Sequence, residues 1–296
     1  MLSPQQYYMI PMYSMCLCVN FLLYENRFRK ISLIQCNILN NLPSIKTFTI
    51  QIHYSIYTIT MNTKFATALF LCALSLTAIQ VQADEQSRKV DPFTEISLRI
   101  GANLHIEQGD KQSVEITAKP STMEQLITEV KDGKLIIRFP NKTLLWKAFQ
   151  PGDITINITT PTIHSLGVVG SGDIIAEDEI KSKIIELDVN GSGNIKLSEL
   201  SSERVKTAIS GSGNIIVAGK TIAQDLSIVI SGSGNFKGLD YRADDVSIKI
   251  SGSGNADIEA KNNLYIRLVG AGIITYKGNP KIDQAITGSG VVKSSN

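Results

Sequence analysis

The chain has 296 residues, with 29 Lys and Arg against 27 Asp and Glu. All four cysteines, five of the basic residues and one of the acidic residues lie before residue 84, so the remaining 213 residues carry a net charge of −2. This charge argues against nucleic acid or an anionic membrane surface as the partner, and the missing cysteines exclude a disulfide framework, a thiol nucleophile and a cysteine metal site.

Residues 1–60 differ in composition from the rest of the chain. They contain none of the 22 glycines but six of the nine tyrosines, and they are rich in residues with AT-rich codons. We interpret them as a disordered extension, translated from DNA upstream of a true start codon at Met61. The alternative is a membrane anchor within residues 9–24, but that run contains Pro11 and Asn20 and is shorter than the ~20 residues that a span needs.

Residues 61–83 have the organisation of a secretory signal peptide. Lys64 supplies the positive start, residues 65–79 form the apolar region, and Val81-Gln82-Ala83 is a small-residue cleavage site. Cleavage leaves Asp84 as the first residue of an exported protein, in the periplasm, on the outer membrane surface or outside the cell.

Residues 84–160 are predicted to be a small antiparallel β region, because apolar and polar residues alternate with the period of a strand. Asp132-Gly133 separates two such runs and predicts a hairpin. Ser121 and Glu124 have the spacing that caps a single helical turn. The alternating positions are Ile96, Leu98 and Ile100; Leu104 and Ile106; Val114 and Ile116; Leu126 and Val130; Leu135, Ile137 and Phe139; and Ile154, Ile156 and Ile158.

The loop of residues 141–152 contains the single tryptophan, Trp146, next to Leu145 and Phe149. Exposed aromatic residues are frequent anchors for a partner, so these three residues are the candidate partner contact. The alternative is that they cap the open end of the fold, which must be covered to prevent edge pairing.

From residue 161 onward, one four-residue phrase recurs with a period close to 20, which is typical of a stacked repeat architecture. Its small residues predict tight corners, with glycines supplying positive φ. The copies are Gly170-Ser171-Gly172-Asp173, Gly191-Ser192-Gly193-Asn194, Gly211-Ser212-Gly213-Asn214, Gly232-Ser233-Gly234-Asn235, Gly252-Ser253-Gly254-Asn255, Gly270-Ala271-Gly272-Ile273 and Gly288-Ser289-Gly290-Val291.

Alternating aliphatic residues flank each copy, as in Ile185, Leu187 and Val189 before the second glycine pair. Each repeat is therefore strand, corner, strand. A series of hairpins would not need evenly spaced copies, whereas parallel stacking does, with like residues about 4.8 Å apart. We expect an all-β protein in which residues 161–296 form a parallel β-helix of about seven short coils, with ladders of Ser and Asn at the corners.

These features together resemble the head GIN domain family, described as putative auto-transporter adhesins. The resemblance covers residues 90–296 and implies a right-handed β-helical protein, secreted or in the envelope of a Gram-negative bacterium, without naming a catalytic residue. The residues that carry it are Phe93-Thr94-Glu95-Ile96, Ile106-Glu107-Gln108-Gly109, Lys131-Asp132-Gly133-Lys134-Leu135-Ile136-Ile137, Ile158-Thr159-Thr160-Pro161 and the iterated Gly-Ser-Gly-Asn-Ile.

The residues themselves offer little chemistry. The phrase lacks the Lys-Ser ending of a phosphate loop and the nine-residue period of calcium rolls, and His105 and His164 have no ligand-spaced partners. We therefore expect no cofactor, metal or catalytic residue. One alternative is a polysaccharide-processing enzyme, for which Glu186 and Asp188 share an outer strand face.

The favoured function is an adhesin-like binding or scaffolding role. Ladders of Ser, Asn, Lys and Thr on an outer face form a regular array suited to a glycan or an envelope protein. A purely structural alternative uses the last coil, residues 285–292, whose edge is available to pair with a second copy and form a homodimer.

Overall fold

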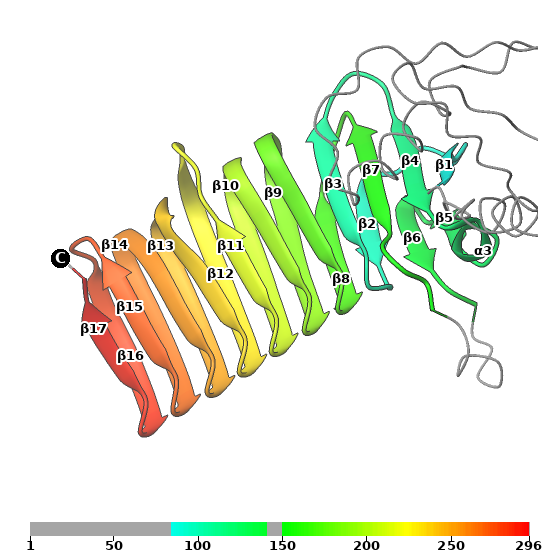
Figure 1. Ribbon diagram of the computed structural model, residues 1–296. Coiled ribbons are helices and arrows are strands. Elements are labelled where there is room, and N and C mark those ends of the chain that lie inside the picture. The colour runs from blue at the N-terminus through cyan, green and yellow to red at the C-terminus, as the bar shows by residue number, and fades with distance from the viewer. Residues whose placement is uncertain (1–83, 141–149, 296) are drawn as a thin grey trace, which may run out of the picture. The chain divides into compact units, whose positions relative to one another are not determined.

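The computed structural model describes residues 84–140 and 150–295, which are β-structure almost throughout (Figure 1). They form a parallel β-solenoid of about six turns, against the seven coils expected. The expected upstream extension, the signal peptide and the three aromatic-loop residues Trp146, Leu145 and Phe149 lie outside the described residues. The N-terminal strands are β1 (Asp84–Ser87), β2 (Glu95–Leu98), β3 (Asn103–Gln108), β4 (Ser113–Ala118), β5 (Ile127–Lys131), β6 (Lys134–Arg138) and β7 (Thr155–Thr160).

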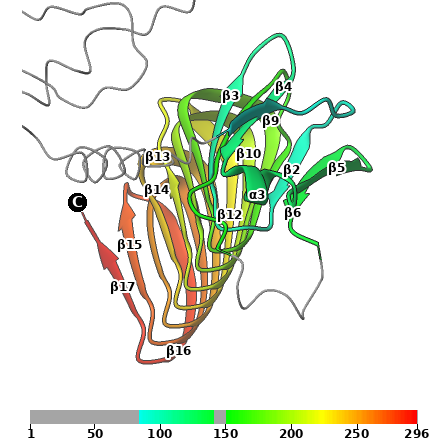
Figure 2. The ribbon, with the colours of Figure 1, turned by 45° about the vertical axis from the view of Figure 1, so that its right-hand side comes forward.

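The solenoid has two walls that meet at the glycine corners. Strands that lead into a corner pair with one another and form the pre-corner sheet, and strands that leave it form the post-corner sheet. Several strands pass through both walls, bending on the side opposite the corners (Figure 2). The strands are β8 (Ser165–Gly170), β9 (Asp173–Gly191), β10 (Asn194–Gly211), β11 (Asn214–Val217), β12 (Ile222–Gly232), β13 (Asn235–Gly252), β14 (Asn255–Gly270), β15 (Ile273–Lys277), β16 (Lys281–Gly288) and β17 (Val291–Ser294).

Equivalent positions of successive repeats lie in register, which confirms the parallel stacking predicted from the period. Gly191 pairs with Gly211, Gly211 with Gly232, and Gly232 with Gly252. Because every corner residue meets its own counterpart, a side chain that fits at one coil fits at the next. Each coil contacts its immediate neighbours and no coil further away contributes much.

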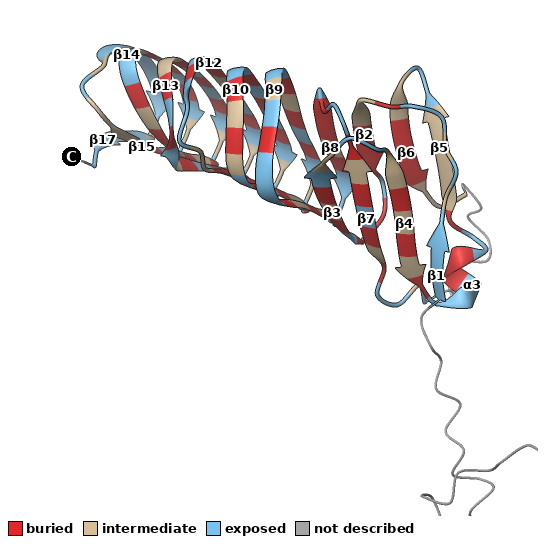
Figure 3. Ribbon diagram, turned by 90° about the horizontal axis from the view of Figure 1, so that it is seen from above, coloured by how far each residue is buried: buried red, intermediate tan, exposed pale blue. Residues whose placement is uncertain are grey.

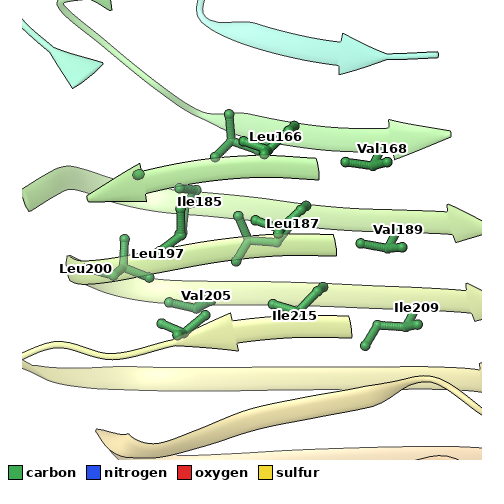
Figure 4. Packing of buried hydrophobic residues seen from close by; sticks show 14 of the residues in the cluster. Leu166, Val168, Ile185, Leu187, Val189, Leu197, Leu200, Val205, Ile209 and Ile215 are labelled. Carbon is green, nitrogen blue, oxygen red and sulfur yellow. The ribbon is translucent and has the colours of Figure 1, made fainter. Parts of the chain in front are cut away.

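The core is a set of aliphatic ladders between the two walls. Along β10, β12 and β13, buried residues alternate with more exposed ones, as the bands in Figure 3 show. Leu187 of β9 and Ile195 of β10 are fully buried, and Figure 4 shows such side chains stacked coil upon coil. Burying one Leu or Ile side chain contributes about 1.5 to 3 kcal/mol, so these ladders are the main source of stability.

The N-terminal region is antiparallel only in part. β2 and β3 belong to the parallel stack, because β2 pairs in parallel with β8, and β3 with β9. On their other edges β2 pairs in parallel with β6, and β3 with β7. Antiparallel pairing is confined to β1 with β4, β4 with β7, and β5 with β6. The parallel pairing of β2 with β8 and of β3 with β9 was not expected. Residues 95–108 keep the apolar alternation of the repeats but lack the Gly-Ser-Gly phrase.

Two local predictions have different outcomes. The β5–β6 hairpin is confirmed, with φ of 53° at Asp132 and 74° at Gly133, as its two-residue turn requires. The helical cap by Ser121 and Glu124 is wrong: Lys119 precedes the one-turn helix α3 (Pro120–Met123), which starts two residues earlier than a cap at Ser121 requires and has no side-chain cap. Pro120 sets the first helical φ and lacks an N–H that would need capping.

Candidate binding surface

The glycine corners use their own backbone groups to hold the stack together. The N–H groups of Ser192 and Gly193 both donate to the carbonyl oxygen of Gly170, at 2.8 and 2.9 Å. The same pair of bonds recurs at the following corners as far as Gly254. Because these donors are occupied, the corner is not a cradle for phosphate, despite its glycine-rich sequence.

The two glycines of each phrase are required for different reasons. The first has a positive φ, 112° at Gly170 and 131° at Gly191, which side chains rarely adopt. The second has no positive φ, although the sequence prediction assigned that role to the glycines of the phrase without distinction. A Cβ on Gly254 would lie 2.5 Å from the carbonyl oxygen of Gly234, so the second glycine is needed because the coils approach closely.

The asparagines of the phrase form a continuous hydrogen-bonded ladder along the post-corner sheet. Asn194 donates to the Asp173 carboxylate at 2.6 Å, and Asn214 to Asn194 at 2.7 Å. Asn235 and Asn255 continue the ladder, each bond being 2.8 Å long. These amides are therefore engaged with one another, which removes asparagine from the array expected to meet a ligand.

The serines before the corners, unlike the asparagines, have side chains that are available to a ligand. Ser210, Ser231 and Ser251 lie in register on the outer face of the pre-corner sheet and are exposed. Among the described residues no hydrogen bond joins their hydroxyl groups to one another, in contrast to the expected hydroxyl ladder. Their spacing of about 4.8 Å leaves each hydroxyl free to bond with a ligand or water.

The two acids considered for catalysis have different surroundings. Lys206 lies 2.9 Å from the Glu186 carboxylate, in an exposed ion pair. Asp188 remains accessible to solvent but has neither a hydrogen bond nor an ion pair with any described residue. Desolvation by its surroundings and the nearby Glu186 raise the pKa of Asp188, and Lys134 opposes this shift. The row continues as Ala208 and Val229, so no third acid joins them.

Both histidines occupy outward positions on the protein surface. His105 occupies an outward position on β3, between the buried Leu104 and Ile106. His164 is exposed just before β8, and its backbone N–H donates to the carbonyl oxygen of Thr94. Within residues 84–140 and 150–295, no group of three or more His, Asp or Glu side chains is placed to hold a metal ion.

Sequence analysis missed an open groove on the side opposite the corners, with a volume of about 470 Å³. Lys181, Lys183 and Glu203 line it together with hydroxyl-bearing residues. The lining residue Ser202 is held from the core by Tyr241, whose buried hydroxyl donates to the carbonyl oxygen of Ser202 at 3.3 Å. Burial raises the pKa of Tyr241 to about 12. The signal in the sequence was the polar run Lys181-Ser182-Lys183, which returns as Ser201-Ser202-Glu203 one coil later.

In the described part of the chain, no helix has the length and apolar character needed to cross a membrane.

Comparison with known proteins gives a family and a set of related folds. A family model described as "Putative auto-transporter adhesin, head GIN domain" matches residues 92–280. No curated protein sequence matches the chain.

Several crystal structures are similar over nearly their whole length. A putative lipid binding protein from Parabacteroides distasonis is 25% identical, with a TM-score of 0.62, over 73% of this chain and 98% of that one. A putative adhesin from Bacteroides fragilis is 22% identical, with a TM-score of 0.66, over 72% and 97%. A putative adhesin from Parabacteroides merdae is 21% identical, with a TM-score of 0.58, over 73% and 98%. The last two likenesses support the solenoid fold alone.

Proposed function

Because the chain belongs to the head GIN domain family, we propose that it is an exported, non-enzymatic module of the cell envelope with an adhesin-like binding or scaffolding role. The family and two of the similar structures carry the description of adhesins. What this chain adds is a surface suited to that role, on the outer face of the pre-corner sheet.

The proposal rests on rows of polar side chains on this face, in which equivalent residues of successive coils lie in register. Ser210, Ser231 and Ser251 repeat in one row, while Lys206 and Glu186 form a charged pair in another. Because the backbone stack fixes these rows, little side-chain or loop entropy is lost when a repetitive partner binds. A glycan with regularly spaced hydroxyl groups is such a partner, and an envelope protein is the other candidate.

Export is part of the proposal and rests on the signal peptide predicted at residues 61–83. The test combines cell fractionation with a glycan array, using the exported protein purified from the producing cells. We expect the protein in the periplasm, on the outer membrane surface or in the medium, and selective retention of one glycan class. Retention of no glycan, together with cleavage of a polysaccharide, would instead support the enzyme alternative.

Self-association is a second candidate, and it has its own observation. β16 pairs only with β14 among the described strands in its wall, so its other edge is open. Ile282 and Ile286 occupy inward positions of this last coil, yet each has 38% of its surface exposed. An open strand edge with exposed aliphatic residues favours pairing with a second copy.

Sedimentation at increasing protein concentration tests this pairing. We expect a monomer to dimer transition that is lost in an Ile286→Lys variant, because the added charge lies on the pairing edge. A monomer at every concentration removes self-association without affecting the binding role.

A further inference from the structure

The outer face of the pre-corner sheet contains a hollow of about 340 Å³, centred where β2, β8 and β9 lie side by side (Figure 1). We call it the Asp188 hollow. Its floor is one row of the register, formed by Ser97, Gly167, Asp188 and Ala208. The row continues with Val229, whose larger side chain ends the depression. The hollow therefore exists because small residues occupy neighbouring coils.

Gly167 is a position where the fold does not require a glycine. Its φ lies outside the left-handed region, and an added Cβ would meet nothing closer than the carbonyl oxygen of Ile96, at 3.5 Å. That is an ordinary van der Waals contact. From Gly191 onward, in contrast, an added Cβ on a corner glycine would clash with the backbone of the preceding coil. The missing side chain at Gly167 thus opens the hollow and has no other structural role.

Asp188 is the unpaired charge of the hollow. The neighbouring charges are engaged, since Lys134 lies 2.9 Å from Glu95 and Lys206 lies 2.9 Å from Glu186. With Asp188 included, these five side chains have a net charge of −1. The walls remove part of the solvent around its carboxylate, which has no counter-ion of its own among the described residues. A ligand that brings a positive charge or hydrogen-bond donors would supply what is missing.

The rim adds groups that suit a polyhydroxylated ligand. Asn190 and Ser210 line the hollow, and their side chains make no hydrogen bond with other described residues. An amide and a hydroxyl both donate and accept, as ring hydroxyl groups of a sugar require. A protein lysine would also satisfy Asp188, but its thin stem would leave these rim groups and most of the volume unused.

We propose that the Asp188 hollow binds one sugar residue that carries a free protonated amine, with the amine on the Asp188 carboxylate and the ring over Gly167. The inference rests on the proposed adhesin-like function and names the ligand class that this surface would recognise. Ring hydroxyl groups bond to Asn190 and Ser210. The specificity lies in the charge, because acetylation of the amine removes the partner of Asp188.

The test measures binding of oligosaccharides of glucosamine, and of the same oligosaccharides fully N-acetylated, to the exported protein at pH 7 by titration calorimetry. We expect the free-amine form to bind about 10 to 100 times more tightly than the acetylated form, as for loss of a charge-assisted hydrogen bond. Asp188→Asn should reduce binding of the free-amine form by a similar factor. Gly167→Val should abolish it, because the valine fills the hollow on a strand position that tolerates β-branched residues.

The matched control is Asp257→Asn, which removes the same charge from an outward position on the post-corner sheet and should leave binding unchanged. Thermal unfolding of each variant verifies that the fold is retained.

The possible failures are distinguishable. If the protein retains another glycan on the array, and Asp188→Asn and Gly167→Val do not affect that binding, the amino-sugar inference is wrong and the proposed function stands. If no glycan or envelope protein binds, the proposed function fails as well. Equal effects of Asp188→Asn and Asp257→Asn would show general charge attraction and overturn the site, as would oligolysine that competes as strongly as the sugar.

Discussion

Gly232 offers the most direct test of the corner geometry. Its φ is 122°, and a Cβ placed there would lie 2.5 Å from the carbonyl oxygen of Gly211 in the preceding coil. Alanine at this position therefore meets two separate costs. The backbone would be held in a region that side chains rarely adopt, and the two coils would have to separate at a corner that holds them together through hydrogen bonds.

The expected loss can be worked out from these two terms. Backbone strain of this kind costs about 1 to 3 kcal/mol, and overpacking a tightly packed site costs about 1 to 3 kcal/mol. The free energy of unfolding of Gly232→Ala should therefore fall by about 2 to 6 kcal/mol. For a chain of this size the corresponding decrease in Tm is roughly 4 to 24 °C.

The assay is urea and thermal unfolding followed by circular dichroism, with Gly167→Ala as the matched control. Gly167 also lies in the stack, but its added Cβ meets only ordinary contacts, so alanine there should be neutral or should stabilise by about 0.5 to 1 kcal/mol. Should Gly232→Ala and Gly167→Ala unfold at the same urea concentration, the account of the corner would be refuted.

Two further predictions concern side chains. Asn214→Ala should lower the free energy of unfolding by about 1 to 3 kcal/mol, because it removes the hydrogen bonds to Asn194 and Asn235. The control is Ser212→Ala at an exposed position, which should change the free energy of unfolding by less than about 0.5 kcal/mol. Equal urea midpoints for the two variants would contradict a stabilising role for the asparagine ladder. Asp188→Asn should raise Tm at neutral pH, because the pKa of Asp188 is raised and its ionised form therefore disfavours the folded state. This difference should vanish as the pH falls through the folded pKa, and a difference independent of pH would show that the charge of Asp188 is not its cause.

The stack was predictable because its determinants repeat in the sequence. Corner glycines at a nearly constant period, flanked by alternating aliphatic residues, are compatible with few folds other than parallel coils. The Asn ladder followed from the same register. The parallel stacking of β2 and β3 was missed because these strands turn without the Gly-Ser-Gly phrase. Only the apolar alternation was available there, and alternation alone does not distinguish parallel from antiparallel pairing.

The hollow could not be predicted for a different reason. Gly167 and Asp188 belong to successive coils, and their contact depends on which residues face each other across the strands. A shift of one residue would have placed them on opposite faces. The strand positions were visible in the sequence, but the register that joins Gly167 to Asp188 is a property of the assembled sheet.

The side-chain amides of the ladder that begins at Asp173 all point the same way, so their dipoles add. Each amide from Asn194 to Asn255 donates toward the preceding coil, and the last one accepts from the N–H of Ile273. The aligned amide dipoles therefore point their positive ends toward Asp173, and such aligned bonds strengthen one another. The single acidic residue of the column stands where that positive end is greatest, much as an acidic side chain does at the start of a helix. The negative charge of Asp173 therefore stabilises the aligned amides. This explains physically why the first of these five phrases ends in aspartate and the other four end in asparagine.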